Sequence, residues 1–313
     1  MSHAIVYTRF GGPEVLTLSE VPDPVAGEGE IVVRVEAAGV NPIDAKLRGG
    51  LRASDTIGEP RHVGSDAAGI VTAVGSGVDG FRAGDPVALK DVEGAYATDV
   101  VVAAKNAWIR PPGVSAAEGA ALGIPVGTAY QTVRSLDVGP GDTLLVNGGS
   151  GAVGQAIVQF AVAWGATVVA TASPRRFARI EALGAIPVAY GDGLADRVRA
   201  AAPGGVTVAI DAAGTDEAIL TSIELVPDKS RIATIVRGRD AAGFGIRAFG
   251  GGSPIGLTPQ QSAWRVEAVP VALALLAAGA FSIELGDTFP LAEASAAHRA
   301  VEEGANGKII LVP

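Results

Sequence analysis

The chain has 313 residues, a formal net charge of −9, 48% hydrophobic residues and no cysteine. The length suggests two domains, and the lack of cysteine excludes disulfides, thiolate metal ligands and a cysteine nucleophile. The acidic balance argues against nucleic acid and anionic membrane surfaces as partners, and no apolar stretch is long enough to span a bilayer. The N-terminus lacks the pattern of a secretory signal, so we expect a cytoplasmic protein.

Short runs of β-forming residues fill the first 110 residues and are separated by Gly, Pro and Asp turns. These runs predict strands at 4–7, 16–19, 31–38, 67–74, 86–89 and 97–103. We therefore expect the first part of the chain to be β-rich.

The pattern changes near Ser115, which can cap a helix with Glu118 at the capping-box position. Strands and helices then alternate to about residue 250, which is typical of a parallel sheet with crossovers. Later elements are predicted as strands at 206–211 and 231–236, a helix at 259–278, a strand at 289–291, a helix at 292–303 and a strand at 308–312. The return to strand at the end predicts a discontinuous first domain, residues 1–118 with 279–313, around a second domain, residues 119–278.

Residues 142–176 are the most informative part of the chain. Gly149, Gly151 and Gly154 have the spacing G-x-G-x-x-G between a predicted strand and a predicted helix. In such a loop the first glycine allows a tight turn, the second lets a pyrophosphate approach the backbone, and the third lets the helix pack against the strand. The loop therefore predicts a nucleotide site, with the phosphates at the helix N-terminus.

The end of the next strand, which begins at Thr167, indicates which nucleotide binds. An NAD site usually places Asp or Glu there to bind the ribose 2′-hydroxyl. Here Ser173 is followed by Arg175 and Arg176, and no carboxylate is available. Hydrogen bonds to a charged group contribute about 1.5–3 kcal/mol each, so the two guanidinium groups favour a 2′-phosphate and hence NADPH. The alternative is that both arginines lie on the first turn of an exposed helix.

Five ordered motifs resemble the medium-chain dehydrogenase/reductase superfamily, in its zinc-independent quinone oxidoreductase branch. They are GVNPID at 39–44, HVGSDAAGIVTAVGSGVDGFRAGDPV at 62–87, the text at 120–130, NGGSGAVG at 147–154 and NGKIILVP at 306–313. The resemblance covers nearly the whole chain. It implies an α/β protein with a GroES-like β-rich substrate domain and a Rossmann domain, whose doubly wound parallel sheet binds NADPH.

The chain departs from the zinc-dependent members of this superfamily at the positions of the catalytic ligands. Those members use Cys, then His or its neighbouring Glu, and usually a further Cys, whereas the matching positions here are Asn41, Ser65 with Asp66, and Ile124. The lobe with four cysteines that holds a structural zinc is missing as well. Since a catalytic zinc needs three protein ligands, we predict that the chain binds no zinc.

Without zinc, a donor or a cation must stabilise the negative charge that forms on a reduced carbonyl oxygen. The loop after residue 40 offers Asn41, Asp44, Lys46, Arg48 and Arg52. Typical quinone reductases of the branch have tyrosines at the positions that resemble Lys46 and Arg52, and the text NPIDAKLR is closer to alkenal/enone reductases. We hypothesise that Lys46 or Asn41 stabilises the anion and that solvent supplies the proton. Asp44 either acts as an acid, or it instead holds Lys46 or a turn of the backbone. The alternative for Lys46 is that it lies on a solvated edge of the loop.

The glycine motif and the resemblance together give the expected cofactor contacts. They are Asn41, Thr128, Gly149, Ser150, Gly151, Ala152, Val153, Gly154, Ser173, Arg175, Arg176, Tyr190 and Lys308. The alternatives are a buried turn hydroxyl for Thr128, strand-end packing for Tyr190 and an exposed strand-start lysine for Lys308. For His298, packing is favoured over chemistry.

We expect an enzyme that reduces a small-molecule quinone with NADPH. The alternative within the same fold is reduction of the C=C bond of an α,β-unsaturated carbonyl, and the alternative from another class is a protein that binds NADPH without turnover. The run FGIRAF at 244–249 is predicted to be an edge strand of the cofactor sheet. An exposed edge invites pairing, and resembling proteins join two subunits there, so we expect a homodimer.

Overall fold

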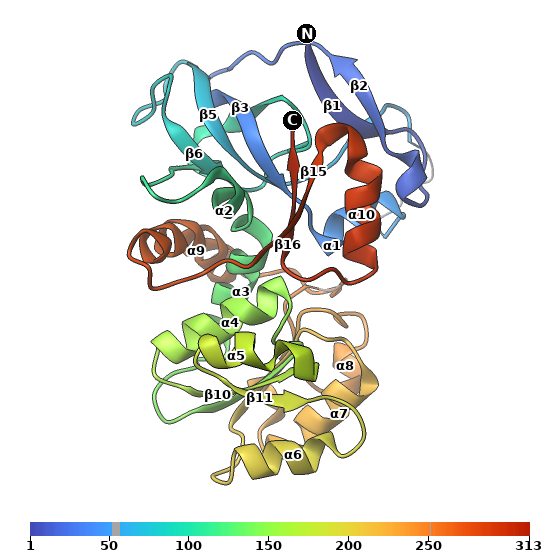
Figure 1. Ribbon diagram of the computed structural model, residues 1–313, viewed down its shortest axis with the longest axis vertical. Helices are drawn as coiled ribbons and strands as arrows, with labels where there is room; N and C mark the ends of the chain where they lie inside the picture. The colour runs from blue at the N-terminus through green and yellow to red at the C-terminus, as the bar shows by residue number, and fades with distance from the viewer. Residues whose placement is uncertain (52–56, 251) are drawn as a thin grey trace. The chain divides into compact units, whose positions relative to one another are not determined.

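The computed structural model describes residues 1–51, 57–250 and 252–313, so Arg52 lies outside the described residues. The described residues form two compact units (Figure 1): unit 1 consists of Met1–Ile124 and Val269–Pro313, and unit 2 of Pro125–Ala268. The domain limits expected from the sequence stay a prediction. No helix in the described part of the chain is long and apolar enough to cross a membrane.

Unit 1 is mainly a β-structure. Its strands are β1 (Ser2–Tyr7), β2 (Thr17–Val21), β3 (Glu30–Gly39), β4 (Arg61–His62), β5 (Asp66–Val74), β6 (Pro86–Leu89), β7 (Asp99–Ala103), β8 (Ala107–Ile109), β15 (Leu285–Pro290) and β16 (Lys308–Val312). One sheet has the strand order β15-β16-β3-β5-β6-β8, with β7 also paired with β3, and another has the order β2-β1-β4. The helices that lie within unit 1 are α1 (Pro42–Arg48), α2 (Ala116–Ala120) and α10 (Ala294–Glu302).

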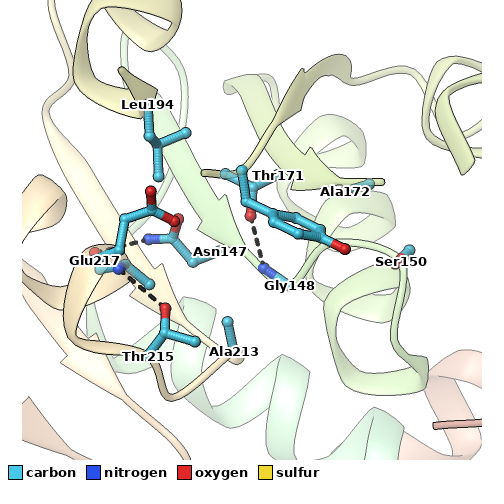
Figure 2. Close-up of a pocket in the computed structure, with 11 residues that line it drawn as sticks. Asn147, Gly148, Ser150, Thr171, Ala172, Leu194, Ala213, Thr215 and Glu217 are labelled. Atoms are coloured by element: carbon cyan, nitrogen blue, oxygen red, sulfur yellow. Dashed lines mark hydrogen bonds between the residues drawn. The ribbon is translucent and has the colours of Figure 1, made fainter. Parts of the chain in front are cut away.

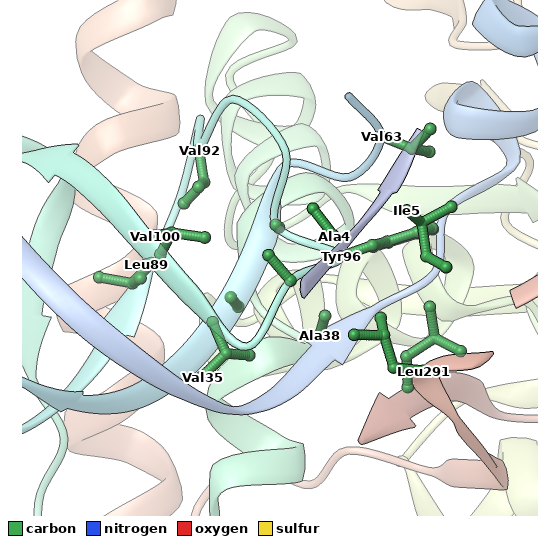
Figure 3. Close-up of a cluster of buried hydrophobic side chains, with 14 of the residues drawn as sticks. Ala4, Ile5, Val35, Ala38, Val63, Leu89, Val92, Tyr96, Val100 and Leu291 are labelled. Atoms are coloured by element: carbon green, nitrogen blue, oxygen red, sulfur yellow. The ribbon is translucent and has the colours of Figure 1, made fainter. Parts of the chain in front are cut away.

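The core of unit 1 is built from strands that are buried along much of their length. In β3, Ile31 and Val33 are fully buried, and the strand alternates between buried and exposed side chains only from Val33 to Glu36, where Arg34 and Glu36 are exposed. The ring of Tyr96 lies in the same core, among valine and leucine side chains from several strands (Figure 3). Its position matters below, because its hydroxyl group reaches a polar cluster at the end of β3.

Unit 2 contains a parallel sheet with the strand order β11-β10-β9-β12-β13-β14. Its strands are β9 (Thr143–Asn147), β10 (Thr167–Ala172), β11 (Ile186–Ala189), β12 (Val208–Asp211), β13 (Ile232–Thr234) and β14 (Arg247–Ala248). Its helices are α4 (Ala152–Ala163), α5 (Phe177–Ala182), α6 (Leu194–Ala201), α7 (Asp216–Leu225) and α8 (Ala241–Phe244), while α3 (Gly123–Ser135) and α9 (Pro259–Ala277) each have residues in both units. Counted from β9, the order is 3-2-1-4-5-6, that of the doubly wound dinucleotide-binding fold. The predicted fold class is therefore confirmed.

The central strand of unit 2 shows why this sheet is parallel and covered. Leu144, Leu145 and Val146 of β9 are each 0% exposed, so both faces of the strand are buried. Continuous apolar runs of this kind are typical of parallel sheets with helices on both faces. Each strand is followed by a helix up to β12, which places the strand ends and helix beginnings at one edge of the sheet.

The structure differs from the sequence prediction at the edge of the unit 2 sheet. The strand predicted at 244–249 is largely wrong, because Phe244 ends α8 and β14 comprises only Arg247 and Ala248. Gly245 has a φ of 72°, a left-handed conformation that ends the helix and interrupts any strand. The sequence prediction also does not include β4 and β8, strands of only two and three residues.

Candidate cofactor site and buried polar cluster

The glycine loop of unit 2, which we define as residues 147–151, connects β9 with α4. Gly148 has a φ of 78°, so the tight turn lies at this residue and not at Gly149, where the sequence motif placed it. The backbone N–H of Gly148 donates to Oγ1 of Thr171 at 2.9 Å, and the N–H of Gly149 donates to the carbonyl oxygen of Thr171 at 2.9 Å. These two bonds fix the loop against β10.

The three glycines of the motif have different structural requirements. A Cβ atom at Gly154 would overlap with the carbonyl oxygen of Gly148 and lie 2.8 Å from Cα of Gly149, so only glycine lets α4 approach the loop this closely. A Cβ atom at Gly149 would lie 2.7 Å from Cβ of Ala170. At Gly151 the nearest heavy atom would be 3.7 Å away, an ordinary contact, so the fold itself tolerates a side chain there. The open space at Gly151 suits the close approach of a pyrophosphate.

The N-terminus of α4 has the properties of an anion site. Gly151 is the N-cap and supplies no side-chain hydrogen bond, and the first turn contains no acidic residue. The backbone N–H groups of Ala152 and Val153 lie in this turn, where helix geometry gives them no acceptor. Together with the helix dipole, these groups favour a bound negative charge.

A cavity of about 230 Å³ lies next to the glycine loop, at the carboxyl ends of β9 and β10 and beside the loop after β12 (Figure 2). It is lined by Asn147, Gly148, Ser150, Thr171, Ala172, Tyr190, Leu194, Ala213, Thr215, Glu217 and Ala218. The strand order reverses between β9 and β12, and this switch point is where open α/β sheets bind their ligands. Two of the predicted contacts, Ser150 and Tyr190, therefore line the cavity at the expected edge of the sheet.

Two polar side chains shape this cavity. Nδ2 of Asn147 donates to the carbonyl oxygen of Ala218 at 3.2 Å and to Oγ of Ser222 at 3.0 Å, which leaves its buried Oδ1 without a partner among the described residues. The carboxylate of Glu217 accepts a hydrogen bond from the N–H of Gly191 at 3.0 Å. A buried acceptor beside a cavity suits a ligand that brings a hydrogen-bond donor.

The residues expected at a 2′-phosphate lie at the ends of two neighbouring strands. Ala172 of β10 is in register with Ala189 of β11, so Ser173 and Tyr190 follow adjacent strand ends. Tyr190 is 61% exposed, so the alternative of strand-end packing is wrong. Arg175 and Arg176 form a short turn of 3-10 helix, η3 (Pro174–Arg176), directly after Ser173, and neither lines the cavity.

A second group of polar side chains, which we call the polar cluster, lies in unit 1. It consists of Asn41, Asp44, Asp66, Tyr96 and Lys308, which are at most 4% exposed. Asn41 is the N-cap of α1, and its backbone N–H donates to Oδ2 of Asp44 at 2.9 Å in a capping box. The hydroxyl group of Tyr96 donates to the same oxygen at 2.8 Å. Asp44 therefore holds a backbone turn, one of the roles that the sequence left open.

The side chain of Asn41 is fully engaged within the polar cluster. Its Oδ1 accepts a hydrogen bond from the ammonium group of Lys308, and its Nδ2 donates to Oδ2 of Asp66 at 2.9 Å and to the carbonyl oxygen of Gly39 at 3.3 Å. The backbone N–H of Ile124 also donates to Oδ2 of Asp66, at 2.9 Å. Both amide hydrogens of Asn41 are thus used inside the protein.

Burial and charge pairing act against each other in the polar cluster. Burial raises the pKa of Asp44 to about 6, although hydrogen bonds from Asn41 and Tyr96 oppose the increase. Burial also raises the pKa of Asp66, and the nearby ammonium of Lys308 opposes this. For Lys308, burial lowers the pKa, and the carboxylates of Asp66 and Asp44 counter the effect. The charge of Lys308 therefore offsets part of the cost of burying the two carboxylates, and their charges offset part of the cost of burying the ammonium.

The basic residues of α1 lie in two different environments. The side chain of Lys46 is exposed and has no hydrogen-bonding partner among the described residues, whereas its carbonyl oxygen accepts a hydrogen bond from the N–H of Leu51. Arg48 is 3% exposed and donates to Glu302 at 2.6 Å and to the carbonyl oxygen of Gly11 at 3.1 Å. Arg48 is therefore a structural residue. Of these two basic side chains, only that of Lys46 is exposed to solvent.

For two other predicted contacts, the structure corrects one detail each, and the contacts themselves stay predictions. Thr128 lies within helix α3 and not in a turn, and its carbonyl oxygen accepts a hydrogen bond from the hydroxyl group of Thr132 at 2.7 Å. The alternative of an exposed strand-start lysine is wrong for Lys308, which is 4% exposed. Asp66 entered the prediction only as a position that matches a zinc ligand, and Tyr96 did not enter it. The signal in the sequence that could have pointed to Asp66 was a carboxylate at the start of the mostly buried run 66–71.

The residues at the zinc-matching positions do not form a metal site. Asn41, Asp66 and Ile124 do come together, but Asn41 and Asp66 are bonded to each other, and Ile124 contributes only its backbone N–H. Among the described residues, no group of three or more His, Cys, Asp or Glu side chains is placed to hold a metal ion. The absence of zinc from the protein stays a prediction.

Comparison with known families matches both units. Residues 27–134 match the alcohol dehydrogenase GroES-like domain, and residues 152–247 match the family described as zinc-binding dehydrogenase. Among curated proteins, human quinone oxidoreductase is 36% identical over 175 residues, which are 55% of this chain and 53% of the human protein. The 2-methylene-furan-3-one reductase of Solanum lycopersicum is 35% identical over 192 residues, 57% of this chain and 49% of that protein. The chain thus aligns with about half the length of these relatives.

Solved structures match the whole chain. The quinone oxidoreductase of Escherichia coli, complexed with NADPH, has a TM-score of 0.84 and 26% identity and covers 100% of both chains. A structure described as an NAD-dependent alcohol dehydrogenase has a TM-score of 0.83 and 30% identity and covers 99% of both chains. The likeness therefore extends over both units and the segments that connect them.

Proposed function

This chain belongs to the medium-chain dehydrogenase/reductase superfamily, and we propose that it is an oxidoreductase that uses NADPH to reduce a quinone. The observation that carries the proposal is the cavity beside the glycine loop, at the switch point of a doubly wound sheet. Arg175 and Arg176 follow β10 in place of a carboxylate, which favours NADPH over NADH. The relatives named as quinone oxidoreductases, and the NADPH complex of one of them, support the same proposal.

The residues of unit 2 fit the parts of NADPH. The backbone of Gly151 and the N–H groups of Ala152 and Val153 would bind the pyrophosphate, at the helix N-terminus described above. Ser173, Arg175, Arg176 and Tyr190 would surround the 2′-phosphate, and Asn41, Thr128 and Lys308 stay proposed contacts elsewhere on the cofactor. When bound, NADPH supplies a hydride, that is, two electrons and a proton, to the substrate.

The protein must stabilise the negative charge that the hydride leaves on the substrate oxygen. Asn41 is a poor donor for this purpose, because both of its amide hydrogens are bonded to Asp66 and Gly39. We therefore assign the role to the exposed ammonium of Lys46. Asp44 contributes by fixing the first turn of α1, which carries Lys46, and solvent supplies the proton that completes the reduction.

The test is a spectrophotometric screen at about 340 nm that follows oxidation of NADPH and of NADH with a panel of quinones and enones. We expect turnover with quinones and a clear preference for NADPH. Binding of NADPH is measured separately by titration calorimetry. If NADPH binds but no member of the panel is reduced, the chain is a binding protein without turnover and the proposal is wrong.

A second candidate activity is reduction of the C=C bond of α,β-unsaturated carbonyls. The tomato relative is named as a reductase of a methylene-furanone, and Lys46 stands where quinone reductases of the resembling branch have tyrosine. Mass spectrometry of the products separates the two activities, since one yields a quinol and the other a saturated carbonyl compound.

We further propose that two copies of the chain pair through the edge of the unit 2 sheet. In the described strand order, β14 is the terminal strand and is in register only with β13. An open edge of this kind can pair with another strand. Light scattering at micromolar concentration should give the mass of a dimer, and a monomer would refute the proposal.

A further inference from the structure

We infer that the ammonium group of Lys308 is a tethered cation that takes the place of a metal ion in unit 1. The inference concerns charge and cation binding in the polar cluster, and its test needs neither NADPH nor turnover. It begins from the positions that match zinc ligands: Asn41, at one of them, bonds both to Lys308 and to Asp66 at another.

The first observation is the balance of charge. Asp44 and Asp66 are 4% and 0% exposed, and a buried carboxylate is costly unless a cation accompanies it. Lys308 is 4% exposed, and its charge attracts both carboxylates. Its ammonium group donates a hydrogen bond to Asn41, which in turn donates one to Asp66. The ammonium of Lys90 also acts on Asp66, but it is bonded to Asp91. Lys308 is therefore the cation that serves the cluster as a whole.

The second observation is that the backbone leaves room for this charge. A Cβ atom at Gly39 would lie 2.8 Å from Cε of Lys308 and would overlap with the carbonyl oxygen of Ala120. A Cβ atom at Gly123 would lie 2.7 Å from Cγ of Asp66 and would overlap with its Oδ1. Both glycines have ordinary negative φ angles, so space and not backbone strain explains them. The fold is thus fitted to the stem of Lys308 and to the carboxylate of Asp66.

The third observation is that the acceptors around the ammonium are those a cation needs. Oδ1 of Asn41 points to Lys308, and Oδ1 of Asp66 is buried without a partner among the described residues. The ammonium has three N–H donors, and a single acceptor, in Asn41, is within hydrogen-bonding distance of it in the described part of the chain. Oxygen atoms from an amide and two carboxylates suit a hard divalent ion as well as an ammonium. Removal of the lysine side chain should therefore create a site for a free cation.

The test uses thermal unfolding of the full chain with Lys308→Ala. We expect the midpoint to fall by about 10 °C, because carboxylates in the interior lose their cation. Ethylammonium chloride, MnCl₂ or ZnCl₂ should then raise the midpoint of this variant in a saturable way, whereas propanol, which is neutral, should not. Titration calorimetry and metal analysis after gel filtration give a second readout, and neither depends on NADPH or on turnover.

The controls separate a cation effect from a general loss of packing. Lys105→Ala removes an exposed lysine of unit 1 and should respond to none of these cations, like the native chain. If Lys308→Ala does not fold, Lys308→Met keeps the length of the stem without the charge, and Asp66→Asn added to it should recover part of the loss. The inference is overturned if Lys308→Met unfolds at the same temperature as the native chain, or if the losses in midpoint caused by Lys308→Met and Asp66→Asn simply add. It is also overturned if folded Lys308→Ala binds no more cation than Lys105→Ala.

Discussion

Arg48 donates a hydrogen bond from its guanidinium group to Nδ1 of His298 at 2.9 Å, deep inside unit 1. Since arginine is always a donor, Nδ1 must accept and the proton of the neutral ring must be on Nε2. That Nε2 is buried and has no partner in the described part of the chain. The ring also meets the ring of Tyr96 edge-on, with centroids 5.7 Å apart. His298 is therefore held neutral, and it links α10 through Arg48 to α1, the helix that carries Lys46.

This arrangement predicts two opposing effects of pH on stability. Burial and the charge of Arg48 lower the pKa of His298 from 6.5 to about 3. Between these values the unfolded chain binds a proton that the folded chain does not, so His298 destabilises the fold by about 1.4 kcal/mol for each pH unit of acidification. Burial raises the pKa of Asp44 from 3.8 to about 6, so Asp44 stabilises the fold with the same slope as the pH falls through that range.

Urea unfolding of two variants at several pH values separates these effects. Relative to the native chain, the unfolding free energy of His298→Gln should rise by about 1.4 kcal/mol per unit as the pH falls from 6 to 4. That of Asp44→Asn should fall with a similar slope over the same range, because this variant has lost the carboxyl group that gains a proton on folding. Parallel curves for the three proteins would show that neither residue has the assigned pKa.

Two glycines of the cofactor loop provide a matched pair of variants. Gly154→Ala places a Cβ atom against the backbone of the glycine loop, so we expect it to destabilise the fold by about 1–3 kcal/mol and to weaken NADPH binding. Gly151→Ala meets only an ordinary contact, so its stability should be close to native while NADPH binds at least about 10-fold more weakly. Urea unfolding and titration calorimetry measure the two quantities. Unchanged NADPH affinity in Gly151→Ala would mean that the phosphates do not approach this residue.

The cofactor loop could be predicted from the sequence because its determinants are local. A buried strand, three spaced glycines and a helix follow one another within residues 143–163, and the structure contains each of them. The detail that could not be predicted is which glycine makes the turn. NGG offers two candidates in a row, and the two hydrogen bonds to Thr171 of the neighbouring strand select Gly148.

The polar cluster could not be predicted, because its contacts join distant parts of the chain. Asn41 contacts Asp66 across 25 residues and Lys308 across 267. These pairs are set by the register of the unit 1 sheet, in which Gly39 of β3 lies opposite Asp66 of β5 and Ile310 of β16. The sequence around Lys308 looks the same whether the lysine is a buried cation or lies exposed at the start of a strand.

Arg175 tests the choice between NADPH and NADH. Its side chain is exposed and makes no hydrogen bond to other described residues, so Arg175→Ala should leave stability unchanged. We expect its KM for NADPH to rise by about 10-fold to 100-fold, the value of one hydrogen bond to a charged group. The KM for NADH, which lacks the 2′-phosphate, should not change and serves as the control within the same variant. An equal change for both nucleotides would place Arg175 elsewhere on the cofactor, or outside the site.

Lys46→Met tests the assignment of the cation that stabilises the reduced substrate. The substitution keeps an unbranched side chain of similar length on the surface of α1, so the unfolding temperature and the affinity for NADPH should stay native. We expect kcat to fall by about 10-fold to 100-fold, because the charge acts when negative charge develops on the substrate oxygen and not when the cofactor binds. Lys105→Met, at an exposed position of the same unit, is the matched control and should be fully active. If Lys46→Met keeps the native kcat, the lysine is a solvated residue of the helix, and the search for the donor moves to the remaining N–H groups of Lys308.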